Sequence, residues 1–293
     1  METAYLFVAV LLLWPVSVLL GRAQWVARAP RLSIVTWFAV GANAAVAIVL
    51  FGFSMLPRRG GASVLQAIGA LVVGRSPLHE WSVGTVVGLS VSGDLLVVGA
   101  ALVVVAQWRL ARERRSFRLL VDLVGEPLRN GAVAVAFDRP CAYFIPGDGG
   151  RVVLSTDLVA GAEPAVIDAV VGHEHGHGLG RHELLLLPFE ALSSTLSFIP
   201  WVRLGQHRVA QAAEFLADDR AAHVAGTPAI LDALRYFGRI RVAGPRCALA
   251  MHGAGTDVRI DRLTNPRSGR WGARWWLVAN GCVAAAMTVT AIR

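Results

Sequence analysis

The sequence predicts a mainly α-helical membrane protein that carries an α+β domain on one side of the membrane. Hydrophobic residues make up 55% and charged residues 16% of the 293-residue chain, whereas soluble domains carry about 25% charged residues. Four stretches are apolar and long enough to cross the roughly 30 Å of hydrocarbon in a bilayer. A long polar region with strand-like and helix-like patterns separates the third stretch from the fourth.

The four apolar stretches define the expected membrane part. Residues 1–108 are predicted to form a bundle with three transmembrane helices, at about 4–20, 33–56 and 83–108. Residues 275–293 are predicted to form a C-terminal transmembrane helix. Asp94 lies near the middle of the third span, where a carboxylate is costly. Two interpretations remain open for it: a protonated packing residue, or a group that faces a partner or a wet cavity.

Arginine distribution predicts the orientation of the spans. All 28 basic residues are arginine. Three of them lie between the first two spans and five directly after the third, at 22, 28 and 31 and at 109, 112, 114, 115 and 118. Positive residues favour the cytoplasmic side, so we expect the N-terminus outside and residues 109–274 in the cytoplasm. Because membrane topology accounts for these arginines, we expect no nucleic-acid partner despite the net charge of +8.

Local patterns within residues 109–274 predict a small sheet followed by helices. Residues 132–137, 141–145 and 152–154 are short apolar runs, and P-G-D-G-G between the last two predicts a hairpin. Pro164 opens a helix that continues through residues 165–178. Residues 184–202 are apolar but contain Glu190 and two prolines. We expect this segment to lie as a helix in the membrane interface or against the bundle, or to dip in as a hairpin.

The first of these helices carries the pattern H-E-x-x-H. His173 and His177 are four residues apart, so both imidazoles project from one helical face. Two neutral imidazoles suit Zn²⁺, and Glu174 between them suits the transfer of a proton from a water molecule. The competing interpretation is a histidine-rich helix face that is merely solvated.

A second predicted helix, over residues 203–226, supplies acidic residues on one face. Glu214 and Asp218 share a stripe with His207 and Gln211, and the oppositely charged partners of a surface stripe are missing because the nearby arginines fall on other faces. Carboxylates gathered in this way need a cation. We therefore assign Glu214 as the third zinc ligand and Asp218 as the hydrogen-bond acceptor of a ligand imidazole.

Three further residues are candidates for the surrounding cleft: His182, His223 and Arg220. His182 follows the motif closely, whereas the other two lie on the second helix beyond Glu214. All three are candidates for stabilising the oxyanion of the reaction, and His182 could instead lie near the substrate or pair with an acid.

These motifs resemble a known group of enzymes. H-E-H-G-H at 173–177 followed by E-F-L-A-D at 214–218 resembles the gluzincin pattern of integral-membrane metallopeptidases, among them HtpX and the CAAX prenyl proteases. V-V-L-S-T-D-L at 152–158 and A-D-D-R-A-A at 217–222 resemble more closely the bacterial beta-lactam sensor–transducer peptidases of the BlaR/MecR type. The resemblance implies a zincin-like metallopeptidase domain with one catalytic Zn²⁺. Well-known sensor–transducers carry an extracellular penicillin-binding domain after the last span, and we expect none here.

The resemblance also implies partners and a location. We expect a multi-pass protein of the bacterial inner membrane that cleaves a cytoplasmic or membrane-proximal protein. In a signalling role, the cleaved protein would be a transcriptional repressor. A homo-oligomer is compatible with the sequence. One alternative is a quality-control protease of the HtpX kind. The other, from a different class, is a zinc-stabilised membrane signalling scaffold without turnover.

Overall fold

The computed structural model describes residues 18–20, 22, 25–58, 62–76, 78–147, 149–239, 255–265 and 281. Two of its helices, α3 (Pro30–Phe53) and α5 (Val83–Val124), are long and apolar enough to cross a membrane, by length and composition. They correspond to the predicted second and third spans. The predicted first and fourth spans lie almost entirely outside the described residues.

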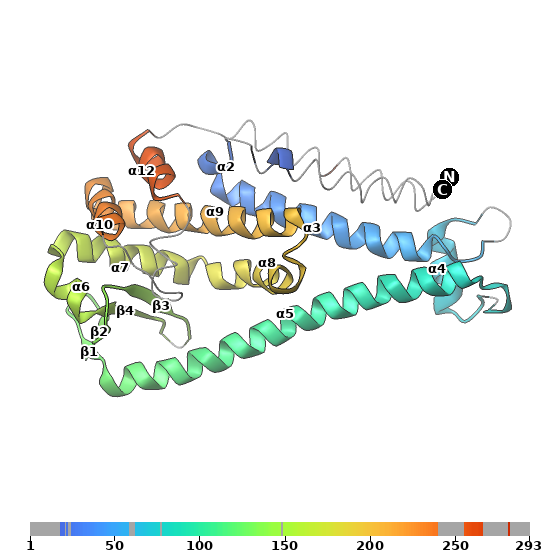
Figure 1. The fold of residues 1–293 in the computed structure, drawn as a ribbon, viewed down its shortest axis with the longest axis horizontal. Helices are drawn as coiled ribbons and strands as arrows, with labels where there is room; N and C mark the ends of the chain where they lie inside the picture. The colour runs from blue at the N-terminus through green and yellow to red at the C-terminus, as the bar shows by residue number, and fades with distance from the viewer. Residues whose placement is uncertain are drawn as a thin grey trace.

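The two long helices meet at one end of the molecule and diverge toward the other (Figure 1). At the closed end, small residues let them approach. A Cβ on Gly52 would overlap Ser92, and the Thr85 hydroxyl donates to the Met55 carbonyl oxygen at 2.6 Å. A short helix, α4 (Val64–Val72), and a turn of 3₁₀ helix at Leu78–Glu80 connect them. The sequence did not predict α4, which begins with a capping box between Ser63 and Gln66.

Helix α5 extends sixteen residues beyond the predicted end of the third span at residue 108. Its apolar part is barely covered, since only 6% of the best apolar window is buried, against 33% for α3. Asp94 is exposed on this surface. The polar end of α5 continues without a break into the sheet region.

The sheet has four strands in the order β1-β2-β4-β3. The predicted hairpin is present, as β3 (Ala142–Ile145) pairs antiparallel with β4 (Arg151–Ser155). The run at 132–137 contributes β2 (Val133–Val135), which pairs in parallel with β4 and antiparallel with the two-residue strand β1 (Glu126–Pro127). β4 is therefore central, and β3 is an edge strand.

Successive side chains of a strand point to opposite faces of the sheet, and both faces of this sheet are covered by helices. Val152 and Leu154 of β4 join the core formed with α6 (Thr156–Gly161), α7 (Pro164–Leu179) and α10 (Thr227–Arg239). Val153, between them, faces the opposite way and packs with Val121 near the C-terminal end of α5. The same long helix thus contains a candidate membrane span and one cover of the sheet.

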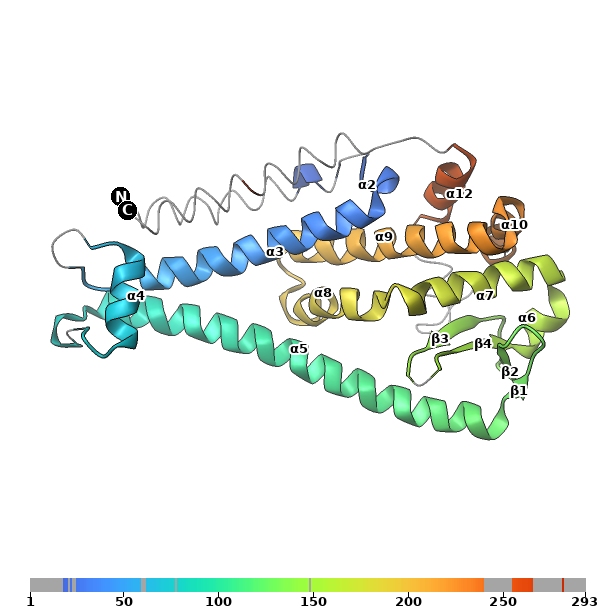
Figure 2. The same ribbon diagram turned by 180° about the vertical axis from the view of Figure 1, so that it is seen from behind.

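The remaining described helices pack around α3, α5 and α7, except the last one, which packs against α10 (Figures 1 and 2). They are α2 (Trp25–Arg28), α8 (His182–Leu196), α9 (Pro200–Ala225) and α12 (Thr256–Thr264). A second apolar core joins α2, α3, α8 and α9. The apolar segment predicted at 184–202 is therefore a helix packed against its neighbours, followed by a turn and the first residues of α9. It is also tied to α5, since Arg114 and Glu183 form an ion pair at 2.8 Å.

Candidate metal centre

The centre is built on two helices, α7 and α9, whose backbones approach closely. The approach depends on small residues at four-residue spacing on both helices. A Cβ on Gly176 would lie 2.9 Å from the Ala217 Cα atom, and one on Gly172 would lie 3.3 Å from that of Ala221. Larger residues here would force the helices apart. The glycines flanking H-E-H in the sequence thus bring the α7 histidines to the carboxylates of α9.

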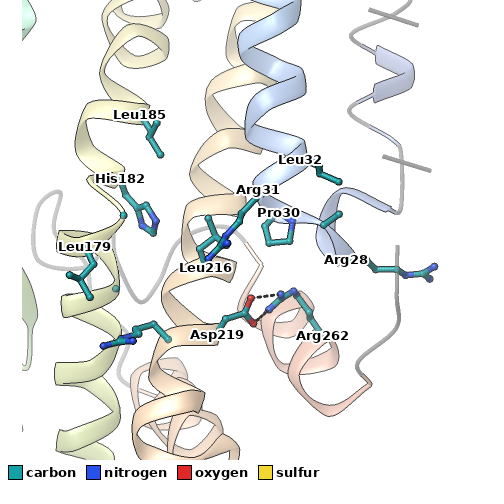
Figure 3. A pocket seen from close by; sticks show the side chains of 14 residues that line it. Arg28, Pro30, Arg31, Leu32, Leu179, His182, Leu185, Leu216, Asp219 and Arg262 are labelled. Carbon is teal, nitrogen blue, oxygen red and sulfur yellow. Dashed lines mark hydrogen bonds and ion pairs between the residues drawn. The ribbon is translucent and has the colours of Figure 1, made fainter. Parts of the chain in front are cut away.

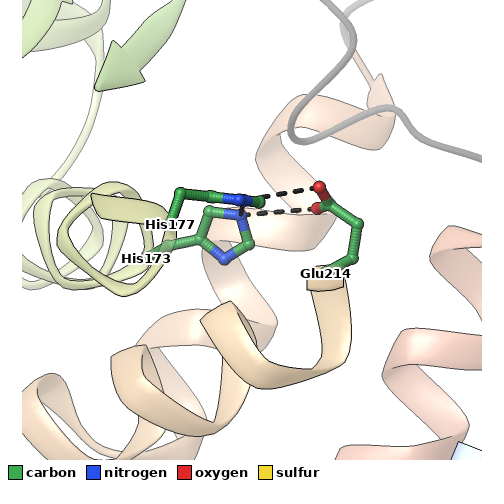
Figure 4. A group of neighbouring side chains, drawn as sticks. All are labelled: His173, His177 and Glu214. Carbon is green, nitrogen blue, oxygen red and sulfur yellow. Dashed lines mark hydrogen bonds and ion pairs between the residues drawn. The ribbon is translucent and has the colours of Figure 1, made fainter. Parts of the chain in front are cut away.

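Three of the predicted ligands meet between these helices, as Figure 4 shows. The Nε2 atoms of His173 and His177 lie 3.1 Å apart. Each lies 3.4 Å from an oxygen of Glu214. Within the part of the chain that the structure describes, these residues form the one group of histidine, cysteine and acidic side chains arranged to hold a metal ion.

The spacing and chemistry of the three side chains fit a divalent cation. Tetrahedral zinc with bonds of 2.0–2.1 Å needs its ligand atoms about 3.3 Å apart, close to the observed 3.1–3.4 Å. Desolvation by burial lowers the pKa of His173, but the carboxylates of Asp218 and Glu214 outweigh it and raise that pKa to about 9. The surroundings therefore favour positive charge at this point, which a metal ion supplies in place of a proton.

The outer nitrogen of each histidine lies close to a polar side chain. His173 Nδ1 lies 3.1 Å from Asp218 Oδ1, and both side chains are fully buried. His177 Nδ1 lies 3.0 Å from the Nδ1 atom of His182. Such contacts direct the lone pair of each Nε2 atom toward the shared centre, because a neutral imidazole has one donor and one acceptor nitrogen.

His182 reaches His177 because the chain reverses between α7 and α8. Arg181 has the left-handed conformation, with φ of 46°, and Gly180 leaves room for the His182 ring, which a Cβ would overlap. Burial and the neighbouring His177 lower the pKa of His182 to about 3. The ring is thus neutral and able to accept the His177 Nδ1 proton. The sequence had placed His182 in the cleft without a partner.

A buried arginine from α12 completes the group, and the sequence analysis missed it. Arg259 is 1% exposed and donates two hydrogen bonds to Asp218, at 2.8 and 2.5 Å. Its Nη1 atom lies 3.0 Å from Glu214 Oε2. The inference that the acidic stripe lacked a positively charged partner was therefore wrong. The partner lies 41 residues away from Asp218 in sequence, and no local spacing could reveal it.

Glu174 lies beside the metal ligands and the edge strand. It is 2% exposed, and its Oε1 atom has no hydrogen-bond partner among the described residues. Burial raises the pKa of Glu174, while His177, His173 and a backbone hydrogen bond from Phe144 of β3 act in the opposite direction. The carboxylate is poised to exchange a proton next to the ligands.

Phe144 also fixes the position of β3 against α7. A Cβ on Gly178 would overlap the Phe144 ring, so this glycine lets the strand lie against the helix. Within the described residues, β3 pairs on one side only. The central strand β4 is paired on both sides, so it has no edge to which a substrate strand could add. The open edge belongs to β3.

The other predicted cleft residues lie farther from the ligands. Arg220 lines a separate cavity beside His182. His223 is exposed near the end of α9, nine residues or about 13.5 Å along the helix from Glu214. Arg208 is one of the nearby arginines that the sequence analysis places on other faces of this helix. It nevertheless reaches the polar stripe, because it donates a hydrogen bond to Gln211 at 2.7 Å.

The comparisons with known proteins agree with this geometry. Residues 108–241 match the model of peptidase family M48. The matched range contains the sheet, α7 and α9, and with them His173, His177 and Glu214. Peptidases of this family are zinc-dependent, and the match supports a zinc metallopeptidase. No curated protein and no solved structure matches the chain significantly.

Proposed function

We propose that the protein is a zinc-dependent membrane endopeptidase in which His173, His177 and Glu214 hold the ion and Glu174 is the general base. The observation that carries this proposal is the convergence of two imidazole nitrogens, 3.1 Å apart, on the Glu214 carboxylate, which has a different oxygen 3.4 Å from each of them, beside a buried carboxylate with an unpartnered oxygen. A non-catalytic zinc site does not need that additional carboxylate.

The roles of the surrounding residues follow from their positions. Zinc, when bound, supplies a Lewis acid that polarises the scissile carbonyl and acidifies water. Glu174 takes the proton of the attacking water and passes it to the leaving amine. Its raised pKa suits both steps, since the carboxyl group must hold the proton between them. Asp218 and His182 hold the two imidazoles in orientation from behind.

The substrate class follows from the open edge of the sheet. An extended peptide can add to β3 by main-chain hydrogen bonds, which tolerate varied side chains. Because the Phe144 backbone already lies beside Glu174, a peptide on that edge would run past the general base. We therefore propose a protein substrate with an extended cleavable segment.

Glu174→Gln tests whether the protein turns over substrate. The variant should bind one zinc ion per chain like the wild type, measured by elemental analysis, and should lose about 10²–10⁴-fold of its activity on an unfolded protein. Glu163→Gln, at the exposed start of α7, is the matched control and should keep full activity. Equal activity in wild type and Glu174→Gln, with zinc still bound, would establish the scaffold alternative.

The physiological substrate is the finer part of the proposal. We favour a regulatory protein, such as a transcriptional repressor, because of the resemblance at residues 152–158 and 217–222. Quantitative proteomics of cells with wild type or Glu174→Gln should then reveal one dominant cleaved protein in the cytoplasm. Accumulation of many misfolded membrane proteins in the variant would instead assign a quality-control role.

A further inference from the structure

A cavity of about 860 Å³ is lined by His182 (Figure 3), the residue whose Nδ1 atom lies 3.0 Å from the Nδ1 atom of the metal ligand His177. Its walls come from the end of α2, the start of α3, the junction of α7 and α8, the C-terminal half of α9, and Arg262 of α12. It is distinct from the β3 edge, because no residue of the sheet lines it.

The charged side chains around this cavity are mostly positive. Asp219 is the one acidic residue among those that line it, and both of its oxygens accept hydrogen bonds from Arg262 at 2.7 Å. Arg31 and Arg220 also line the cavity, and neither has an ion pair with any residue that the structure describes. Arg28, which also lines the cavity without an ion pair among the described residues, turns its guanidinium group away from it in Figure 3. The cavity therefore offers the guanidinium groups of Arg31 and Arg220, whose charge is uncompensated, and it would attract an anion.

Further hydrogen-bond donors line the same space. The first turn of α3 borders the cavity, and its N-cap, Ala29, provides no side-chain cap for the free backbone N–H groups. His182 is 2% exposed, and its ring is turned toward the cavity in Figure 3. Its Nδ1 atom is engaged with His177, whereas its Nε2 atom has no partner in the described chain. With His177 bound to a metal ion through Nε2, its Nδ1–H would donate to His182 Nδ1, and the His182 proton would then be on Nε2, free to be donated.

The remaining walls are apolar, and this favours an anion that is attached to an apolar group. Leu32, Leu185 and Leu216 line the cavity together with the arginines. The cavity opens beside the first residues of α3, a candidate membrane span, so it would lie at the membrane surface if the proposed membrane location is correct. Basic pockets beside spanning helices are typical sites for acidic lipid headgroups.

We propose that this cavity binds the phosphate group of an acidic phospholipid, with Arg31, Arg220, the first turn of α3 and the His182 Nε2–H as its donors. The bound headgroup would contact His182, which in turn contacts the zinc ligand His177. The lipid site is thereby one side chain removed from the metal centre. This proposal rests on the membrane location but not on peptidase activity.

The experiment measures lipid retention by the full-length protein loaded with zinc. The protein is purified from nanodiscs of phosphatidylcholine containing phosphatidylglycerol, and bound lipid is quantified by native mass spectrometry. Arg31→Gln combined with Arg220→Gln should lower phosphatidylglycerol retention about tenfold or more. Arg115→Gln combined with Arg203→Gln removes the same charge from exposed positions outside the cavity and should change retention less than twofold. Leu216→Trp, which fills the cavity without changing charge, should also lower retention.

Three results would overturn the proposal. One is an absence of preference for phosphatidylglycerol over phosphatidylcholine in the wild type. Another is an equal loss in both double variants, which would mean general attraction between arginines and the membrane. The third is complete displacement of the lipid by millimolar inorganic phosphate or glycerol phosphate, which would assign the site to a free phosphate. Because retention is measured without turnover, an inactive peptidase leaves this test intact.

Discussion

Replacing Arg259 by Gln should destabilise the protein strongly, because it removes the cation that lies between the buried carboxylate of Asp218 and the partly buried carboxylate of Glu214. Arg259 contacts Asp218 through two hydrogen bonds and Glu214 at 3.0 Å. Removal of one partner from a buried ion pair costs about 3–5 kcal/mol. For a region of this size that corresponds to a fall of roughly 6–20 °C in the unfolding midpoint. The loss should be larger without zinc, since the metal ion and Arg259 both neutralise Glu214.

Arg235→Gln is the control for this prediction. Arg235 and its partner Asp232 are 51% and 58% exposed, and exposed pairs of this kind contribute about 0.3–0.5 kcal/mol. The midpoint, followed by circular dichroism in detergent with and without zinc, should fall by no more than about 2 °C. Equal midpoints for the two variants would refute the assignment of Arg259 as a buried structural cation. A zinc-independent loss would refute its coupling to Glu214.

Three more predictions follow from the centre and its helices. His182→Ala should weaken zinc binding about 10–100-fold, because His177 loses its partner, and competition with a chelator should show this while the exposed His223→Ala leaves affinity unchanged. Gly176→Ala should destabilise the protein by about 1–3 kcal/mol, because its Cβ would press on α9. Gly99→Ala, which has open space around its Cβ, should be neutral or stabilising in the same denaturation assay. Removal of zinc by a chelator should abolish peptidase activity and lower the unfolding midpoint, and adding the metal back at about 100 times its Kd should restore roughly 2.7 kcal/mol.

Local spacing explains why much of the centre could be predicted. His173 and His177 share a helix face, and so do Glu214 and Asp218, so helical periodicity alone groups each pair. The hairpin was also predicted from a local signal, the P-G-D-G-G turn between two apolar runs. That the two pairs face each other was inferred from the need of the carboxylates for a cation, and the distances between the pairs agree with this inference.

The features that escaped prediction depend on contacts between distant segments. Arg259 lies on another helix than Asp218, and the sequence around residue 259 does not indicate that the two side chains form a hydrogen bond. The parallel pairing of β2 with β4 made β4 central, so the open edge moved to β3. The end of α5 also could not be read from hydropathy, since a helix that leaves the apolar stretch need not end there.

The unbroken course of α5 has a mechanical consequence. Its 42 residues span about 63 Å. The boundary predicted between the membrane part and the cytoplasmic part, at residues 108 and 109, falls within this continuous helix. One end contacts α3 near Met55, and the other packs against the sheet at Val153. A tilt of only about 3° at the first end would swing the second by about 3 Å, the length of a hydrogen bond. The alignment of the β3 edge with Glu174 is therefore geometrically tied to how the distant apolar segment leans.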